Sequence, residues 1–180
     1  MPCLVVVIAL SGLVVRLTSI PVMDRVLWTG GDFARAAPAD AFHTEAVAAA
    51  LTMLGAEYHY GSDGTGCPAG QHDVCADCSG LVVLAYAAVG VKLPHSTAAL
   101  AEVGQPVLLT DLQPGDILLF RADGKAQEPL DHCGLYVGNG LFLHAGSRGV
   151  RLDDLDEGYW GRREPARLRG ARRVLALPRR

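Results

Sequence analysis

Three side chains of types that carry acyl-transfer chemistry lie far apart in this sequence: Cys78, His132 and His144. Cys78 stands at the predicted start of a helix, where free backbone N–H groups and a partial positive charge favour thiolate over thiol. A thiolate nucleophile, a histidine base and a second polar ring that orients the base form a triad suited to acyl transfer. We therefore expect nucleophilic catalysis, provided that the fold brings the three residues together.

The two histidines flank residues 138–140 (Gly-Asn-Gly), which are typical of a β-hairpin turn. If these residues form a three-residue loop, His132 faces Gly146, and His144 becomes its diagonal neighbour on the same face of the hairpin. Taken singly, a cysteine or a histidine is more often a structural residue than a catalytic group. The combination of a cysteine at a helix start with two histidines on one face of a hairpin favours a catalytic site over three separate structural residues.

The elements that must hold these residues change in type along the chain. Helices are predicted first and antiparallel strands after them, which indicates an α+β fold. The predicted helices span residues 41–54 (with Asp40 as N-cap), 79–89 and 97–103. The predicted strands span residues 116–120, 133–137, 141–145, 150–152 and 172–176.

Composition and charge narrow the function classes. The chain has 180 residues, of which 50% are hydrophobic, so one domain with a sizeable core is expected. Residues 1–160 carry eight Lys/Arg against eighteen Asp/Glu, whereas residues 161–180 carry eight Arg against one Glu. The acidic body argues against nucleic acid as a partner, and we expect the Arg-rich end to be solvated. No run of twenty apolar residues occurs, so no transmembrane span is predicted.

Residues 1–40 form a candidate N-terminal extension. They contain a twelve-residue apolar run, Leu4–Val15, whose length suits a secretory signal although no Lys or Arg precedes it. The β-branched residues of the run and the Ser11-Gly12 pair suit a β-hairpin equally well. Both interpretations stay open, and residues 41–180 are assigned to the main domain.

A set of short motifs occurs in order along residues 42–176. The motifs are Asp77-Cys-Ser-Gly-Leu-Val, Leu93-Pro94, Ser96, Leu112-Gln-Pro-Gly-Asp116, His132-Cys-Gly-Leu-Tyr-Val-Gly-Asn-Gly and His144-Ala. In order and spacing they resemble the NlpC-type family of papain-like cysteine peptidases. The resemblance implies a helix that carries the nucleophile, packed on an antiparallel sheet that carries the histidines. It also implies hydrolysis of bacterial cell-wall peptides, typically between γ-D-glutamyl and a diamino acid.

The same resemblance assigns roles residue by residue. It makes Cys78 the nucleophile, His132 the general base and His144 the orienting residue. Tyr58 matches the tyrosine that lines the site and helps to hold the oxyanion. Asp77 and Ser79 match residues that hold the free amino end of the substrate peptide. Ser96 matches a residue of another substrate subsite. Asp77 is explained equally well as a helix N-cap.

The sequence differs from the family pattern at three places near the triad, but all three triad residues are present. His95 follows Leu-Pro where the family usually has Arg, and residues 62–76 form a longer loop. Both departures concern residues around the predicted substrate-binding positions. Cys133 stands where the family usually has Val or another apolar residue. Because it adjoins His132 on a strand, we expect its side chain to point to the opposite face, into the core.

Two further cysteines, Cys67 and Cys75, close a short loop just before the nucleophile. We interpret them as a disulfide that pins this insertion beside the site, which implies an oxidising compartment. A zinc site built from Cys67, His72, Cys75 and Cys78 is the competing interpretation, but no second ligand pair at finger spacing supports it. A reversible bridge between Cys75 and Cys78 is a third arrangement.

These inferences converge on a cysteine peptidase that cleaves peptide bonds of bacterial peptidoglycan and requires no cofactor or metal. We expect a monomer that is secreted or resides in the cell envelope, with the wall peptide as its partner. Two alternatives stay open: an amidase or acyltransferase on the same papain-like scaffold, and a catalytically silent wall-binding module. Trp160 is expected in the core or as a sugar-stacking platform, and residues 153–157 as a solvated turn.

Overall fold

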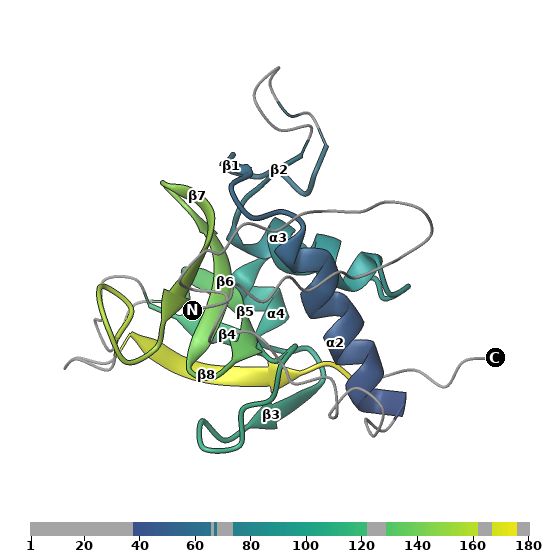
Figure 1. Cartoon of the computed structure of the whole chain (residues 1–180), viewed down its shortest axis with the longest axis vertical. Helices are drawn as coiled ribbons and strands as arrows, with labels where there is room; N and C mark the ends of the chain where they lie inside the picture. The colour runs from purple at the N-terminus through teal and green to yellow at the C-terminus, as the bar shows by residue number, and fades with distance from the viewer. Residues whose placement is uncertain (1–37, 66, 68–73, 122–128, 162–166, 176–180) are drawn as a thin grey trace, which may run out of the picture.

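The computed structural model describes residues 38–65, 67, 74–121, 129–161 and 167–175, so the expectations for residues 1–37 lie outside its scope. The helices are α2 (Pro38–Leu51), α3 (Cys78–Ala87) and α4 (Thr97–Leu100). The strands are β1 (Glu57–Tyr58), β2 (Cys75–Ala76), β3 (Gln105–Val107), β4 (Ile117–Phe120), β5 (His132–Gly138), β6 (Leu141–Gly146), β7 (Gly149–Asp154) and β8 (Leu168–Arg173). Apart from the two-residue strands β1 and β2, the helices precede the strands, which confirms the α+β prediction (Figure 1).

Six strands form one antiparallel sheet in the order β3-β8-β4-β5-β6-β7. Helix α3 packs against β5 and β6, and α2 packs against α3, so the helices cover one side of the sheet (Figure 1). Leu81 and Tyr86 of α3 and Leu135 and Leu143 of the sheet are fully buried between these layers. Helix α3 carries no charged residue, as is typical of a helix enclosed by other elements. None of the helices in the described ranges is long and apolar enough to cross a membrane.

A smaller aromatic cluster is built around Phe120, Phe142 and Trp160. The Phe120 ring lies 4.9 Å from the Phe142 ring and 5.1 Å from the Trp160 ring. The His132 and His144 rings lie close to the same indole, at 4.5 and 5.4 Å. Since side chains alternate along a strand, this cluster and the helix-covered core occupy opposite faces of the sheet.

The register of the β5–β6 hairpin is the one predicted. Leu135 pairs with Leu143, and continuing this register toward the open end places His144 diagonal to His132 on the same face. The side-chain atoms agree, because His132 Nε2 lies 2.8 Å from His144 Nδ1.

The turn of that hairpin differs from the predicted three-residue loop. Only Asn139 and Gly140 form the turn, and a bulge in β5 lets Gly138 pair with Leu141. Asn139 (φ 54°) and Gly140 (φ 77°) both adopt left-handed backbone conformations, as a type I′ turn requires. The bulge adds the residue that the shorter turn omits, so the register is unchanged.

Two predictions for the ends of the domain are wrong. Helix α2 begins at Pro38, so Asp40 lies within it and is not its N-cap. The described part of the Arg-rich end, residues 167–175, is not simply solvated, because β8 lies between β3 and β4 in the sheet. Arg173 of β8 donates from Nε and an Nη to the two carboxylate oxygens of buried Asp116, both at 2.7 Å. A count of charges cannot reveal such a buried partner.

Candidate active site

Cys78 is the first residue of α3, as predicted. Asp77 caps the helix, because its Oδ1 accepts from the Gly80 N–H at 2.7 Å. The Ser79 hydroxyl donates to the same oxygen at 3.0 Å. This cap fixes the helix start and sets the Cys78 sulfur at the positive end of the helix dipole. The N-cap interpretation of Asp77 is therefore confirmed.

The Cys78 sulfur lies among groups that stabilise its negative charge. A hydrogen bond with the Cys133 thiol makes the largest contribution, and a hydrogen bond with His132 and the charge of that ring add to it. Burial opposes these effects, but the net result lowers the pKa of Cys78 from its ordinary 9.0 to about 4. Cys78 is therefore a thiolate at neutral pH.

Cys133 is fully buried in the helix-side core, as expected, yet it also contacts the nucleophile. Thr97 links the two sulfurs, because its hydroxyl donates to Cys133 Sγ at 3.6 Å and lies 3.8 Å from Cys78 Sγ. The hydrogen bond to Cys78, together with burial, raises the pKa of Cys133 well above its usual value. Cys133 therefore stays protonated and can donate to the thiolate.

A chain of hydrogen bonds leads from His132 to a carboxylate. His132 Nε2 lies 2.8 Å from His144 Nδ1, and His144 Nε2 lies 3.0 Å from Asp153 Oδ2. Asp153 also forms an ion pair with Arg151, its neighbour on β7. The solvated turn expected at residues 153–157 is thus wrong for Asp153, which lies in a strand and joins the site.

The protonation of this chain follows from its partners. Burial lowers the pKa of His144 despite the opposing hydrogen bond with Asp153, so the ring is neutral and carries one N–H. A carboxylate only accepts, so the His144 proton lies on Nε2, and Nδ1 accepts from His132 Nε2–H. The Arg151 Nε–H also points at His144 Nε2, at 3.5 Å, but the shorter contact of that nitrogen with the Asp153 carboxylate, at 3.0 Å, decides the tautomer. The Nδ1 atom of His132 is then left for the hydrogen bond with Cys78.

Tyr58 is brought to the site by the short parallel pair β1–β2, in which it lies beside Ala76, two residues before Cys78. The segment after Tyr58 packs onto the start of α3 at Gly80, where an added Cβ would lie 2.0 Å from the Ser62 carbonyl oxygen. Burial and the negative charge of Cys78 raise the pKa of Tyr58. Its hydroxyl therefore stays protonated and can donate a hydrogen bond.

The three residues predicted to bind substrate differ in exposure. Asp77 and Ser79 are 7% and 5% exposed and are bonded to each other. The Asp77 carboxylate also accepts from the Gly61 N–H and lies 2.9 Å from His95 Nε2. Ser96 is exposed at the N-cap of α4, with no capping bond from its side chain. Substrate contacts for all three stay predictions.

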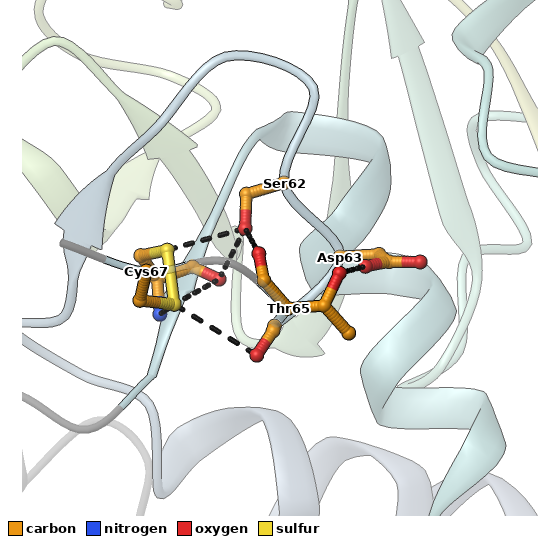
Figure 2. Close-up of a disulfide and its surroundings, with 6 residues drawn as sticks. Ser62, Asp63, Thr65 and Cys67 are labelled. Atoms are coloured by element: carbon orange, nitrogen blue, oxygen red, sulfur yellow. Dashed lines mark hydrogen bonds between the residues drawn. A yellow bond between two sulfur atoms is a disulfide. The ribbon is translucent and has the colours of Figure 1, made fainter.

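The predicted disulfide between Cys67 and Cys75 is present, with the two Cα atoms 5.6 Å apart. Figure 2 shows its surroundings: the Ser62 hydroxyl lies within hydrogen-bond distance of the Thr65 and Cys75 carbonyl oxygens, at 3.1 and 3.3 Å. Two of the four candidate zinc ligands are thus joined to each other, while His72 lies outside the described residues. Cys75 is likewise not bridged to Cys78, which forms no disulfide.

A cavity of about 490 Å³ opens beside the histidines. Tyr58, His132, Arg148, Tyr159 and Trp160 are among the residues that line it. The indole of Trp160 stacks on the His132 ring and forms part of the cavity wall. Substrate atoms in this cavity would therefore lie next to the imidazole of His132.

Sequence reasoning missed four residues that complete the site: Thr97, Cys133, Asp153 and Trp160. Asp153 could have been found, because it follows His144 by nine residues and lies directly after the next predicted strand, residues 150–152. Trp160 belongs to the segment after β7, and no periodicity predicts where that segment returns. The hydrogen bond between Cys133 and Cys78 depends on how α3 packs on β5, which is a tertiary property.

Part of this chain is similar in sequence to known proteins. A family model described as the NlpC/P60 family matches residues 55–169. A probable endopeptidase of Mycobacterium tuberculosis is 47% identical over 107 residues, which are 59% of this chain and 24% of that protein. Murein DD-endopeptidase MepS/murein LD-carboxypeptidase of Escherichia coli is 39% identical over 102 residues, 56% of this chain and 50% of that protein. The chain thus matches about a quarter to a half of the length of these curated relatives.

The solved structure of the peptidoglycan hydrolase RipB of Mycobacterium tuberculosis is similar in fold, with a TM-score of 0.59 and 25% identity. The similarity covers 84% of this chain and 74% of that one. It agrees with the papain-like arrangement seen here, in which the nucleophile helix packs on an antiparallel sheet. Because the family model covers more than half of the sequence, this chain belongs to the NlpC/P60 family.

Proposed function

We propose that this protein is a cysteine peptidase that hydrolyses stem peptides of bacterial peptidoglycan between γ-D-glutamyl and a diamino acid. The observation that carries the peptidase assignment is the continuous chain from Cys78 through His132 and His144 to Asp153. Relatives described as endopeptidases and a peptidoglycan hydrolase support the substrate class. The choice of bond rests on the motif resemblance.

The proposed reaction begins with the Cys78 thiolate and the His132 imidazolium. The sulfur attacks the scissile carbonyl carbon, and the resulting oxyanion accepts from the Cys78 backbone N–H and the Tyr58 hydroxyl. The C–N bond breaks as His132 transfers its proton to the leaving amine, and a thioester remains on Cys78. Water then attacks the thioester with His132 as base, which releases the acid and regenerates the thiolate.

His144 and Asp153 act through His132. The neutral His144 ring accepts from His132 Nε2–H and is held by the Asp153 carboxylate at 3.0 Å. This arrangement keeps the His132 Nδ1 atom directed at the sulfur and stabilises the imidazolium, which are the tasks of the third member of a triad. Because the buried ring of His144 stays neutral, it does not compete with His132 for the proton.

The place of action that we propose is outside the cytoplasm, in the secreted or cell-envelope fraction. The disulfide between Cys67 and Cys75 supports this proposal, because such bonds persist in oxidising compartments. Fractionation of the native host, followed by immunodetection, tests it. Recovery of the protein in the cytosolic fraction alone would contradict it.

The test of activity is mass spectrometry of the tetrapeptide L-Ala-γ-D-Glu-diaminopimelate-D-Ala after incubation with the full chain. We expect the dipeptide L-Ala-D-Glu and the complementary diamino-acid dipeptide, and no products with Cys78→Ala. Loss of D-Ala alone would indicate a carboxypeptidase instead. Transfer of the acyl group to an added amine in place of water would indicate the acyltransferase alternative.

The silent wall-binding module is tested in the same preparation. That alternative predicts equal sedimentation with insoluble peptidoglycan for the wild-type chain and for Cys78→Ala, with no soluble fragments from either. Release of fragments by the wild-type chain alone contradicts it.

A further inference from the structure

The cavity beside His132 is lined by positively charged side chains that have no role in the proposed reaction. Its walls are the rings of Tyr58, Tyr159 and Trp160 and the β6–β7 hairpin, whose turn carries Arg148. The described residues that line it include two arginines and no carboxylate, although the body of the chain is acidic. A cationic cavity in an acidic domain favours a group of negative charge.

The two arginines differ in what they contact. Arg151 is paired with Asp153, so its charge is already balanced. Arg148 is exposed and has no ion pair or hydrogen bond with any described residue. Arg148 is thus the cation of this cavity that can take an incoming anion. A guanidinium presents a planar fork of N–H donors that matches a carboxylate.

The turn that carries Arg148 is held in place. Ser147 and Arg148 form a two-residue turn between Gly146 and Gly149, which pair across the hairpin. The hairpin docks on the segment before Tyr58, because the Val150 N–H donates to the Ala56 carbonyl at 2.8 Å. The fit is close, since a Cβ at Gly149 would lie 2.6 Å from the same oxygen. The backbone that carries Arg148 is therefore fixed relative to the Tyr58 side of the site.

The cavity lies on the leaving-group side of the scissile bond. In the proposed reaction the His132 imidazolium gives its proton to the departing amine, so that amine must lie against the His132 ring. His132 lines the cavity, whereas Asp77 and Ser79, the predicted contacts of the acyl side, are not among its lining residues. The first residue after the scissile bond, the diamino acid, would therefore enter this cavity.

We propose that Arg148 determines specificity by binding a carboxylate on the side chain of the diamino acid, as in diaminopimelate, so that this residue is preferred to lysine. The proposal rests on the proposed function. A carboxylate could also come from the C-terminus of the stem peptide, one residue farther along. The side-chain carboxylate is favoured because it belongs to the residue that adjoins His132.

The test uses two tetrapeptides that differ by one carboxylate, with diaminopimelate or L-Lys at the third position and a C-terminal amide on both. We expect the wild-type chain to cleave the diaminopimelate peptide with a kcat/KM about tenfold higher, the size of one charge-assisted hydrogen bond. Arg148→Gln should remove this preference by slowing the diaminopimelate peptide alone, and Arg148→Lys should restore part of it. Arg169→Gln, an equal change of charge on β8, should leave the preference intact.

Equal effects of Arg148→Gln on both peptides, or no effect on either, would overturn the proposal. An effect that appears only when the C-terminus is a free carboxylate would assign Arg148 to that group and also overturn it. Binding of the same peptides to Cys78→Ala and to Cys78→Ala/Arg148→Gln by calorimetry tests recognition without chemistry. If the chain cleaves nothing, the proposed function fails, while the calorimetric comparison still decides the role of Arg148.

Discussion

The imidazole ring of His132 stacks on the indole ring of Trp160, with centroids 4.5 Å apart and ring planes inclined by 12°. The same indole meets the His144 ring edge-on, at 5.4 Å. Trp160 is 7% exposed, so it shields one face of the proposed base from water and restricts rotation of the ring. Of the two roles expected for Trp160, the structure thus supports packing, and the ring against which it packs is that of the proposed base.

Trp160→Leu should lower kcat about tenfold with little change in KM, because the His132 ring loses the surface that aligns it. Trp160→Phe keeps an aromatic face and should recover most of the lost kcat. Steady-state kinetics on the tetrapeptide, with circular dichroism to verify folding, measures both variants. Equal losses for Leu and Phe would argue against alignment by stacking.

Cys133→Val should raise the pKa of Cys78, because it removes the hydrogen bond that contributes most to lowering it. In the wild-type chain, the rate of alkylation by iodoacetamide should rise as pH increases through about 4 and then level off. In Cys133→Val the midpoint should move upward by about one pH unit, the size of one hydrogen bond to a charged group. Cys133→Ser retains a donor and serves as the control.

Asp153→Asn should lower kcat by about tenfold to a hundredfold, less than loss of the base itself. An amide can offer an N–H to His144, which would favour the wrong tautomer of that ring and misalign His132. Glu157→Gln, an exposed neutralisation in the following turn, should have no effect. His132→Ala should nearly abolish turnover, so a milder loss for His132→Ala than for Asp153→Asn would reverse the assigned roles.

Arg173→Ala should destabilise the fold by about 3 kcal/mol, because it leaves the carboxylate of fully buried Asp116 without its bidentate partner. Urea unfolding followed by tryptophan fluorescence measures the change in the free energy of unfolding. Arg169→Ala, on the same strand but exposed, should change it by less than about 0.5 kcal/mol. Similar values for the two variants would contradict the importance of the buried pair.

Removal of the disulfide by Cys67→Ser/Cys75→Ser should lower the free energy of unfolding by about 2–3 kcal/mol, as expected for closing so short a loop. The bridge lies between Tyr58 and Asp77 in sequence and pins the segment that enters α3. We therefore expect KM to rise more than kcat falls. A change in kcat alone would indicate that the bridge acts on the chemical step instead.

The class of the fold and the three candidate catalytic residues could be predicted from the sequence. Cys78 at a helix start and His132 and His144 about a hairpin turn are local features, and periodicity and turn chemistry predict local structure well. The register that makes the histidines neighbours follows from that turn. The disulfide could be predicted for the same reason, since Cys67 and Cys75 are close in sequence.

The surroundings of these residues depend on tertiary packing. Whether Cys133 reaches Cys78 depends on how α3 seats on β5, and whether Asp153 reaches His144 depends on the pairing of β6 with β7. Trp160 reaches His132 from a segment that no pattern orients, and Arg173 finds Asp116 across two strands distant in sequence. Such contacts join elements through packing, and local propensities do not encode which elements will pack together.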